Sequence, residues 1–329
     1  EAEQRGERLV FSCGETEFEA LWADYFDLST DYEAIQAAID RTGYRPDAAA
    51  QSLRTKSTDY IGFIVPKISS DAVSRVTAGV TQVLSEQGYL CLLANTDDNP
   101  QQELTYLDLF QSRCVAGILL MATILTPRHQ EMLRQCSVPV VVVGQRSQNV
   151  PCVYHDDFNA ARELMDCLIQ RGRRKLVYIG VTELDVAVGL NRRQGVRAAL
   201  TQAGLSPDIP TRLSPFTVEG GRAAMEQLLA EHPDVDGVMC ATDLIALGAM
   251  EALRATGKRL PEDVSVAGID DSWAGIHISP KLTTAHFYYE DCGAEAARLL
   301  LSMADQKRRD DAPVRQTMLG YTVVRRESV

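Results

Sequence analysis

The sequence predicts an α/β fold of two doubly wound parallel-sheet lobes, preceded by a short α-rich N-terminal segment. Three observations support this prediction. Short apolar runs alternate with helix-patterned stretches from residue 59 onward, and the same alternation starts again near residue 160. The 329 residues are enough for two lobes but not for a long array of domains. A series of alternating strands and helices forms open parallel sheets with helices on both faces.

The first series begins with the apolar run 60–66, which ends in a proline as a buried parallel strand can. A helix is expected over 73–84, because Gln87 and Gly88 follow it as a C-terminal glycine signal. The remaining elements of this series are expected as strands at 89–94, 117–121 and 138–144 and helices at 104–110 and 127–135.

The second series predicts another sheet of the same kind. Its elements are expected as helices at 160–172, 191–203, 220–231 and 244–256 and strands at 175–180, 237–241 and 265–269. Open α/β sheets bind ligands at the carboxyl ends of their strands, so two such lobes predict a ligand cleft between them. The alternative, a single large doubly wound enzyme, is disfavoured because no catalytic motif accompanies the pattern.

Composition limits the possible partners. The net charge of −12 argues against nucleic-acid binding over the whole surface, although a small basic DNA-reading domain is compatible with it. No apolar run reaches the roughly 18 residues of a membrane span, and no secretion signal begins the sequence, which favours a cytoplasmic protein. The eight cysteines are scattered singly without a C-x-x-C pair, as free thiols of a reducing compartment would be.

The sequence carries no recognisable catalytic or metal-binding constellation. It has no phosphate loop, nucleophile elbow or zinc-binding helix, and its five histidines are dispersed. Asp156 and Asp157 are adjacent carboxylates, as are Asp270 and Asp271. Neighbouring side chains on a strand or loop point in opposite directions, so neither pair is expected to act as an acid/base couple. The sequence therefore predicts a binding protein that is not an enzyme and needs no cofactor.

Stretches in three parts of the chain carry a resemblance to a known family. Residues 44–55 read Tyr-Arg-Pro-Asp-Ala-Ala-Ala-Gln-Ser-Leu-Arg-Thr, and residues 260–271 read Leu-Pro-Glu-Asp-Val-Ser-Val-Ala-Gly-Ile-Asp-Asp. The others lie at 61–66, 235–249, 280–284 and 323–328. Together they resemble the LacI/GalR family of transcriptional regulators over nearly all of the chain after residue 41. The resemblance implies a periplasmic-binding-protein-like, type I, effector-binding core.

The resemblance also implies the domain boundaries. They are an atypical segment at 1–40 without a helix-turn-helix, a hinge-helix remnant and linker at 41–58, an N-terminal lobe at 59–158 and 287–318, and a C-terminal lobe at 159–286 and 319–329. Residues 1–35 are similar to the end of the N-terminal domain of bacterial 8-oxoguanine DNA glycosylases. The catalytic helix-hairpin-helix of those enzymes has no counterpart here, so no glycosylase activity is implied.

The resemblance further implies that a sugar effector binds between the lobes. Arg192 resembles the arginine that grips ligand hydroxyls, and Asp270 resembles the carboxylate that accepts hydrogen bonds from them. Thr242 and Asn159 occupy polar contact positions, and Phe216 occupies the place of an aromatic ring against the sugar. Sugars need charged, bidentate partners and a flat apolar surface, which agrees with these residue types.

Two further positions extend the predicted site. Lys67 lies close to where trehalose repressors, which this chain resembles in part, place a basic residue that meets a sugar phosphate. A disaccharide or its phosphate is therefore the expected effector. Trp273 and the aromatic run at 287–289 are expected either to line the cleft or to pack the lobe crossover.

Each assignment has a structural alternative. Arg192 is otherwise a surface residue at a helix start, Phe216 a core residue and Lys67 a solvated loop lysine. Asp243 directly precedes an apolar helix and is expected to cap it. Arg192→Ala is expected to abolish sugar binding and leave the thermal stability of the ligand-free chain nearly unchanged.

The family resemblance implies a homodimer that binds operator DNA. Leu53 resembles the residue that wedges into the minor groove, with Ala49 and Arg54 beside it in the hinge remnant. Residues 1–40 lack the helix-turn-helix pattern and are acidic, so operator binding is doubtful, and the segment is either a natural module or a chimeric join. The alternative function is a bilobed sugar-binding protein of a transport system.

Overall fold

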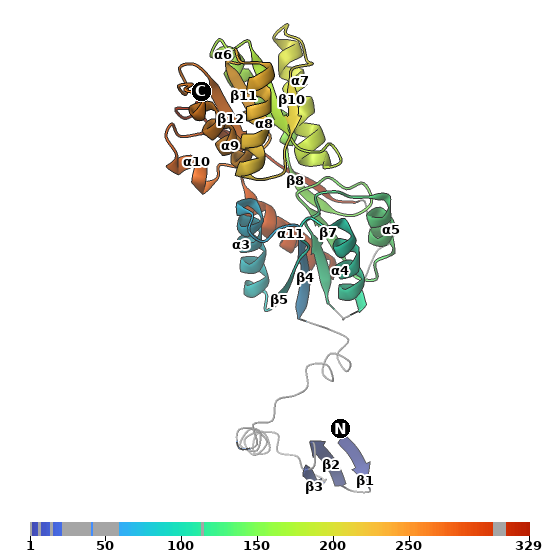
Figure 1. Cartoon of the computed structure of the whole chain (residues 1–329). Helices are drawn as coiled ribbons and strands as arrows, with labels where there is room; N and C mark the ends of the chain where they lie inside the picture. The colour runs from blue at the N-terminus through green and yellow to red at the C-terminus, as the bar shows by residue number, and fades with distance from the viewer. Residues whose placement is uncertain are drawn as a thin grey trace. The chain divides into compact units, whose positions relative to one another are not determined.

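The computed structural model describes residues 59–112, 115–304 and 314–329, together with Arg41 and three N-terminal strands (Figure 1). The chain divides into two compact units, residues 1–57 and 58–329. In the first unit, β1 (Ala2–Arg5), β2 (Arg8–Cys13) and β3 (Thr16–Leu21) form an antiparallel sheet in the order β1-β2-β3.

These strands correct the prediction of an α-rich N-terminal segment. Residues 16–21 read Thr-Glu-Phe-Glu-Ala-Leu, in which polar and apolar residues largely alternate. An alternation with period two is typical of a strand, and the aromatic residue at its centre favours one as well.

The N-terminal lobe of the second unit is built on a six-stranded, all-parallel sheet in the order β14-β8-β7-β6-β4-β5. Its central strands are apolar and fully buried, as the short apolar runs predict. The strands are β4 (Tyr60–Val65), β5 (Leu90–Asn95), β6 (Gly117–Leu120), β7 (Val140–Val143), β8 (Cys152–His155) and β14 (Gln316–Leu319). The helices are α3 (Asp71–Glu86), α4 (Pro100–Ser112), α5 (Pro127–Gln135) and α11 (Tyr289–Ala304).

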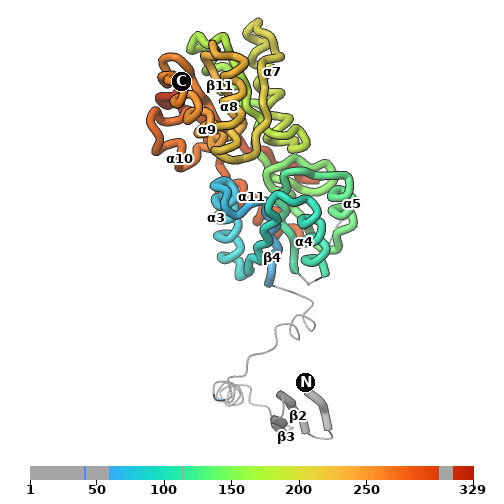
Figure 2. The backbone as a smooth tube through the Cα atoms, in the orientation of Figure 1, coloured from blue at the N-terminus to red at the C-terminus, as the bar shows by residue number. Residues whose placement is uncertain are grey.

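Helices α3 and α11 pack side by side in this lobe (Figure 2). Their close approach depends on two glycines. A β-carbon on Gly79 would lie 1.9 Å from the carbonyl oxygen of Glu290, and one on Gly293 would lie 2.1 Å from that of Val76. Backbone therefore meets backbone where the two helices pack.

The C-terminal lobe has a six-stranded sheet in the order β10-β9-β11-β12-β13-β15, parallel except that β15 runs antiparallel to β13. The strands are β9 (Leu176–Gly180), β10 (Thr211–Leu213), β11 (Gly237–Cys240), β12 (Ser265–Ile269), β13 (Thr283–Phe287) and β15 (Tyr321–Val324). The helices are α6 (Asp157–Gln170), the π-helix η1 (Val186–Asn191), α7 (Arg192–Gln202), α8 (Val218–Glu231), α9 (Asp243–Ala255) and α10 (Trp273–His277).

The backbone passes between the lobes three times. It crosses from β8 into α6, from β13 into α11, and from β14 into β15 through Gly320. The carboxyl ends of β8 and β13 therefore lie at the junction of the lobes, where side chains from both sheets meet. No described helix is long and apolar enough to cross a membrane.

Candidate functional site

A buried arginine lies at the centre of the junction between the lobes. Arg192 begins α7 and is only 2% exposed. Its Nε donates to Asp157 Oδ1 at 2.7 Å, and its Nη1 donates to the carbonyl oxygen of Ala241. Nη1 also lies 3.9 Å from Asp270 Oδ1. Burial raises the pKa of Asp157, and the Arg192 guanidinium opposes that rise.

Asp270 follows β12 and brings a second carboxylate to this arginine. Its Oδ1 accepts a hydrogen bond from the Tyr289 hydroxyl at 2.6 Å. Burial raises the pKa of Asp270 to about 7, against the lowering effect of Arg192. Its backbone has φ of 134°, a region that residues other than glycine rarely adopt and that is common at functional sites.

An aromatic wall borders the charged group. The His155 ring stacks on Phe287 with centroids 4.6 Å apart and an angle of 5° between the planes, and Tyr289 meets His155 edge-on at 5.2 Å. The Arg192 guanidinium carbon lies 5.2 Å from the Phe287 ring centre. Burial lowers the pKa of His155 to about 4, so the ring is neutral at pH 7. Its Nε2 has no hydrogen-bond partner among the described residues.

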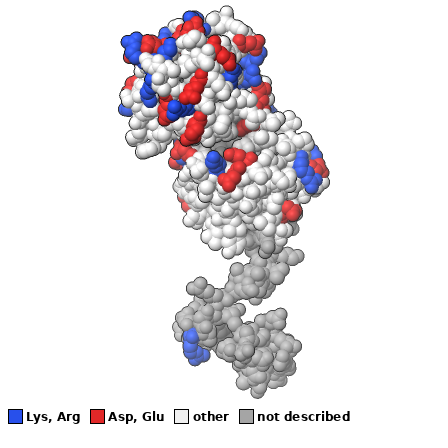
Figure 3. Space-filling view, viewed as in Figure 1, with Lys and Arg blue, Asp and Glu red and all other residues white. Residues whose placement is uncertain are grey.

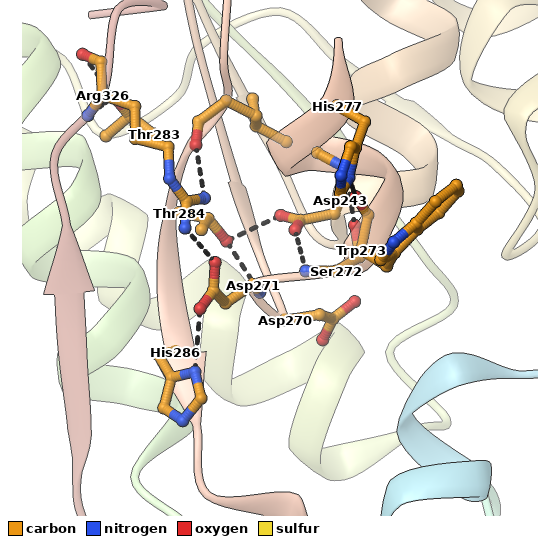
Figure 4. A network of polar contacts seen from close by, with 12 residues as sticks. Asp243, Asp270, Asp271, Ser272, Trp273, His277, Thr283, Thr284, His286 and Arg326 are labelled. Atoms are coloured by element: carbon orange, nitrogen blue, oxygen red, sulfur yellow. Dashed lines mark hydrogen bonds and ion pairs between the residues drawn. The ribbon is translucent and has the colours of Figure 1, made fainter.

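A buried carboxylate organises the loop that carries Asp270 (Figure 4). Asp243 is fully buried; its Oδ2 accepts from the Ser272 backbone N–H at 2.8 Å and its Oδ1 from the Thr284 hydroxyl at 2.7 Å. The prediction that Asp243 caps its helix is wrong. Thr242 is the N-cap, with an extended backbone and a side chain that accepts from the N–H of Ile245 at 3.4 Å.

The two adjacent carboxylates after β12 diverge, as the sequence predicts. Whereas Asp270 contacts Tyr289 and Arg192, Asp271 accepts hydrogen bonds from Arg326 and, at 2.9 Å, from His286 Nδ1 (Figure 4). Asp271 therefore ties β12 to β13 and the C-terminal segment, and Asp270 is the one that faces the lobe junction.

Two other residues predicted as polar ligand contacts form hydrogen bonds at the start of their own helices. Asn159 uses its backbone N–H and its Nδ2 to bond the carboxylate of Asp156, at 3.1 and 2.7 Å. Thr242 is 7% exposed, and its hydroxyl is the cap acceptor described above. Neither side chain contacts Arg192 or Asp270 through a described interaction, so their part in ligand binding stays a prediction.

The remaining predicted residues lie on loops or at the rim. Phe216 is half-buried between β10 and α8 and packs against the apolar core. Lys67 is exposed after β4, near Asp98. Trp273 is 70% exposed at the start of α10, and its ring lies 4.5 Å from that of His277. Ala49, Leu53 and Arg54 lie outside the described residues.

Sequence reasoning missed part of this cluster. His155 ends β8, a strand that the sequence pattern does not predict, and Asp157 begins α6. The sequence marks Asp157 only as one of two adjacent carboxylates, and Phe287 and Tyr289 belong to an aromatic run for which it favours neither of two roles. These residues could be found from the rule that parallel strands present their carboxyl ends at one edge of a sheet. Applying that rule requires β8 to be recognised as a strand.

Two further buried groups connect the lobes, and one of them, Asp185, is close enough to Arg192 and Asp157 to feel their charges. Gln145, just beyond β7, donates from Nε2 to Asp185 Oδ1 at 3.3 Å and to the Ala122 carbonyl oxygen at 3.1 Å. Asp185 also caps η1 by accepting from the N–H of Val188 at 2.9 Å. Burial raises the pKa of Asp185 to about 7.

This raised pKa predicts a pH-dependent effect of Asp185→Asn. The folded chain keeps the Asp185 proton up to about pH 7, whereas the unfolded chain releases it near pH 3.8. The contribution of Asp185 to the free energy of unfolding is therefore complete below about pH 4 and is lost as the pH rises through about 7. Asparagine keeps the acceptor oxygen without a charge, so its thermal midpoint relative to the native chain should rise between about pH 5 and about pH 8.

Asp185→Ala is the matched control, because it loses the cap and should lower the midpoint at both pH values. His155 titrates in both proteins and cancels in the comparison. A difference between Asp185→Asn and the native chain that does not change with pH would contradict this explanation.

Exposed ion pairs form a contrasting set. On the face seen in Figure 3, charged side chains are concentrated on the C-terminal lobe. Pairs such as Arg222–Glu226 and Arg197–Asp208 are well exposed and contribute little to stability.

A cavity of about 350 Å³ beside α7 is lined by Arg193, Arg197 and Tyr178 among others, and none of the junction residues lines it. No described cluster of histidine, cysteine, aspartate or glutamate is arranged to hold a metal ion.

Comparison with known proteins shows the class of protein: a model of the periplasmic binding protein-like domain matches residues 165–329. The sucrose operon repressor of Staphylococcus xylosus is 32% identical over 271 residues, 82% of this chain and 84% of that protein. The transcriptional regulator CelR of Thermobifida fusca is 34% identical over 306 residues, 89% and 88% of the two chains. The chain belongs to the LacI family of transcriptional regulators.

Solved structures agree with this assignment. The CelR–cellobiose complex has 30% identity and a TM-score of 0.76 and covers 93% of each chain. CcpA of Lactococcus lactis has 29% identity and a TM-score of 0.76, covering 83% of this chain and 99% of that one. These relatives are transcriptional regulators. The prediction of a regulator's effector-binding core rather than an enzyme is therefore confirmed, and the transport alternative is not favoured.

Proposed function

We propose that this chain is a sugar-responsive regulator core that binds a saccharide at the junction of its lobes. The observation that carries the proposal is the buried Arg192, which reaches Asp157 and Asp270 beside the aromatic wall of His155, Phe287 and Tyr289. A guanidinium and carboxylates supply donors and acceptors for hydroxyls, and the rings supply a flat surface for C–H faces.

The proposed mechanism is an exchange of partners. A sugar hydroxyl donates to Asp270, replacing or sharing the bond from Tyr289, and a sugar oxygen accepts from Arg192. The unpartnered Nε2 of His155 offers one more hydrogen-bonding atom, because its ring is neutral at pH 7. His155 and Tyr289 belong to elements of the N-terminal lobe, whereas Arg192 and Asp270 belong to the C-terminal lobe. The ligand therefore favours the lobe arrangement that it contacts best and shifts the population toward it.

A disaccharide is the proposed effector class. Two relatives are named for disaccharides, the sucrose operon repressor and the regulator solved with cellobiose. Lys67 is exposed and free to meet a phosphate on such a sugar. Trp273, exposed on α10 of the C-terminal lobe, offers a ring to a sugar at the rim of the site. Phe216, Thr242 and Asn159 stay secondary candidates, because their described contacts are local.

The family suggests the remaining partners. We propose a homodimer in the cytoplasm, with operator DNA as the family's nucleic-acid partner. Leu53, with Ala49 and Arg54, is the proposed contact to the minor groove, although no helix-turn-helix pattern occurs within residues 1–40.

Calorimetry of the purified chain tests the effector assignment. The panel is sucrose, cellobiose, maltose, trehalose, trehalose 6-phosphate and glucose, with a purine as the unrelated control. We expect one disaccharide or its phosphate to give a saturable heat. If the phosphate form binds best, Lys67→Ala should weaken it to the level of the unphosphorylated sugar. Heat from the purine alone would contradict the saccharide proposal.

A further inference from the structure

Arg75 lies in the N-terminal lobe and hydrogen-bonds two candidate-site residues of the C-terminal lobe, Asp270 and Phe287. It lies on α3, and its Nη1 donates to the backbone carbonyl oxygen of Asp270 at 3.0 Å. Its Nη2 donates to the carbonyl oxygen of Phe287 at 3.2 Å, and the guanidinium carbon lies 5.1 Å from the Tyr289 ring centre. On its own helix it has only a loose ion pair with Asp71, at 3.7 Å.

The two acceptors are backbone atoms of residues that build the candidate site. Asp270 presents its carboxylate toward Arg192 from a backbone with positive φ, and Phe287 lies under the same guanidinium. Restraining these two carbonyl groups restrains the direction of both side chains. A planar guanidinium can bond both carbonyls at once and also lie over a ring, whereas a lysine ammonium is a compact point charge.

A displacement of these groups would be transmitted to helix α3. It packs backbone to backbone against α11 at Gly79 and Gly293, and α11 begins two residues after Phe287. A movement of Asp270 or Phe287 therefore acts on the α3–α11 pair by two routes, through the Arg75 side chain and through the chain itself. The Gln145–Asp185 pair also joins the lobes, but none of its described hydrogen bonds reaches Asp270.

We propose that Arg75 is a positioning residue that holds Asp270 and Phe287 ready for the effector and links occupancy of the site to helix α3. The link to effector occupancy rests on the proposed function, whereas the positioning of Asp270 and Phe287 by Arg75 does not. Loss of the guanidinium removes the hydrogen bonds from α3 to the loop after β12 and to the end of β13 in the C-terminal lobe. Couplings of this kind typically change affinity by about 5–150-fold.

The first measurement needs no ligand. Amide hydrogen exchange of the full chain is compared for the native protein, Arg75→Ala and Arg75→Lys. Arg222→Ala is the control, since Arg222 is an exposed helix arginine paired with Glu226 four residues on. We expect faster exchange in the peptides containing Asp270 and in the first turns of α3 for Arg75→Ala, a smaller effect for Arg75→Lys, and none for the control. Unchanged exchange in both regions would overturn the proposal.

The second measurement is calorimetry of the same variants with sucrose and cellobiose as probes. For the sugar that the native chain binds, Arg75→Ala should lower the affinity about tenfold or more, Arg75→Lys should fall between, and Arg222→Ala should match the native chain. Altered exchange with unchanged affinity would overturn the link to the site. Altered exchange in a chain that binds neither probe would count against sucrose and cellobiose as effectors and uphold the positioning role.

Discussion

Arg192→Ala is expected to abolish measurable saccharide binding and also to destabilise the ligand-free chain. Binding is lost because the guanidinium is the group that approaches both Asp157 and Asp270 at the junction. Stability falls because Asp157, 4% exposed, is left as a buried carboxylate without its cation. Breaking a buried pair in this way costs about 3–5 kcal/mol. We therefore expect the thermal midpoint to fall by about 5–15 °C.

The second part of this result corrects the expectation from the sequence. A nearly unchanged stability follows only if Arg192 is accessible, and the structure places it in the interior with 2% exposure. Pairing Arg192→Ala with Asp157→Asn separates the two effects. The double variant should recover part of the midpoint, because the buried charge is gone, and should still fail to bind sugar.

Arg193→Ala is the matched control. Arg193 is the next residue of the same helix, but it is only half-buried and pairs with Glu183. It should leave both the affinity and the midpoint near their native values. Calorimetry and thermal unfolding of the four proteins test this prediction, and an unaltered dissociation constant in Arg192→Ala would remove Arg192 from the site.

Most of the two-lobed fold could be predicted from local sequence patterns. Strands such as β4 and β12 are continuous apolar runs, because helices cover both faces of a parallel sheet. The strands that escaped prediction are short, lie at sheet edges or at the lobe junction, and carry polar residues. β10 has three residues, and β14 alternates exposed with half-exposed positions, so neither has a pattern that differs from a loop.

The candidate site was less accessible to prediction, because its contacts join distant parts of the sequence. Arg192 and Asp270 came from family resemblance, and the structure brings them within 3.9 Å of each other. The contact of Arg75 with the Asp270 carbonyl spans 195 residues and involves a backbone atom, which no residue pattern encodes. Asn159 bonds Asp156, the N-cap of its own helix, so its predicted contact with a ligand stays a prediction.

Asp243→Ala is expected to lower stability strongly and to disorder the Asp270 loop. The fully buried carboxylate is the acceptor for the Ser272 N–H and the Thr284 hydroxyl, and its removal leaves both donors unpaired in the interior. Each unsatisfied donor costs about 1–3 kcal/mol, so we expect a loss of about 2–5 kcal/mol. Because Ser272 follows Asp270 by two residues, sugar affinity should fall as well.

Asp243→Asn distinguishes the loss of an acceptor from the loss of a charge. Its amide oxygen can accept from the Ser272 N–H, which only donates, and its amide nitrogen can donate to the Thr284 hydroxyl, which can do either. Burial raises the pKa of Asp243 to about 6, so above that pH the native chain holds a buried charge that the asparagine lacks. We therefore expect Asp243→Asn to lie near the native midpoint at about pH 8, well above Asp243→Ala. Equal losses in the two variants would mean that the loop depends on the charge of Asp243 and not on its two hydrogen bonds.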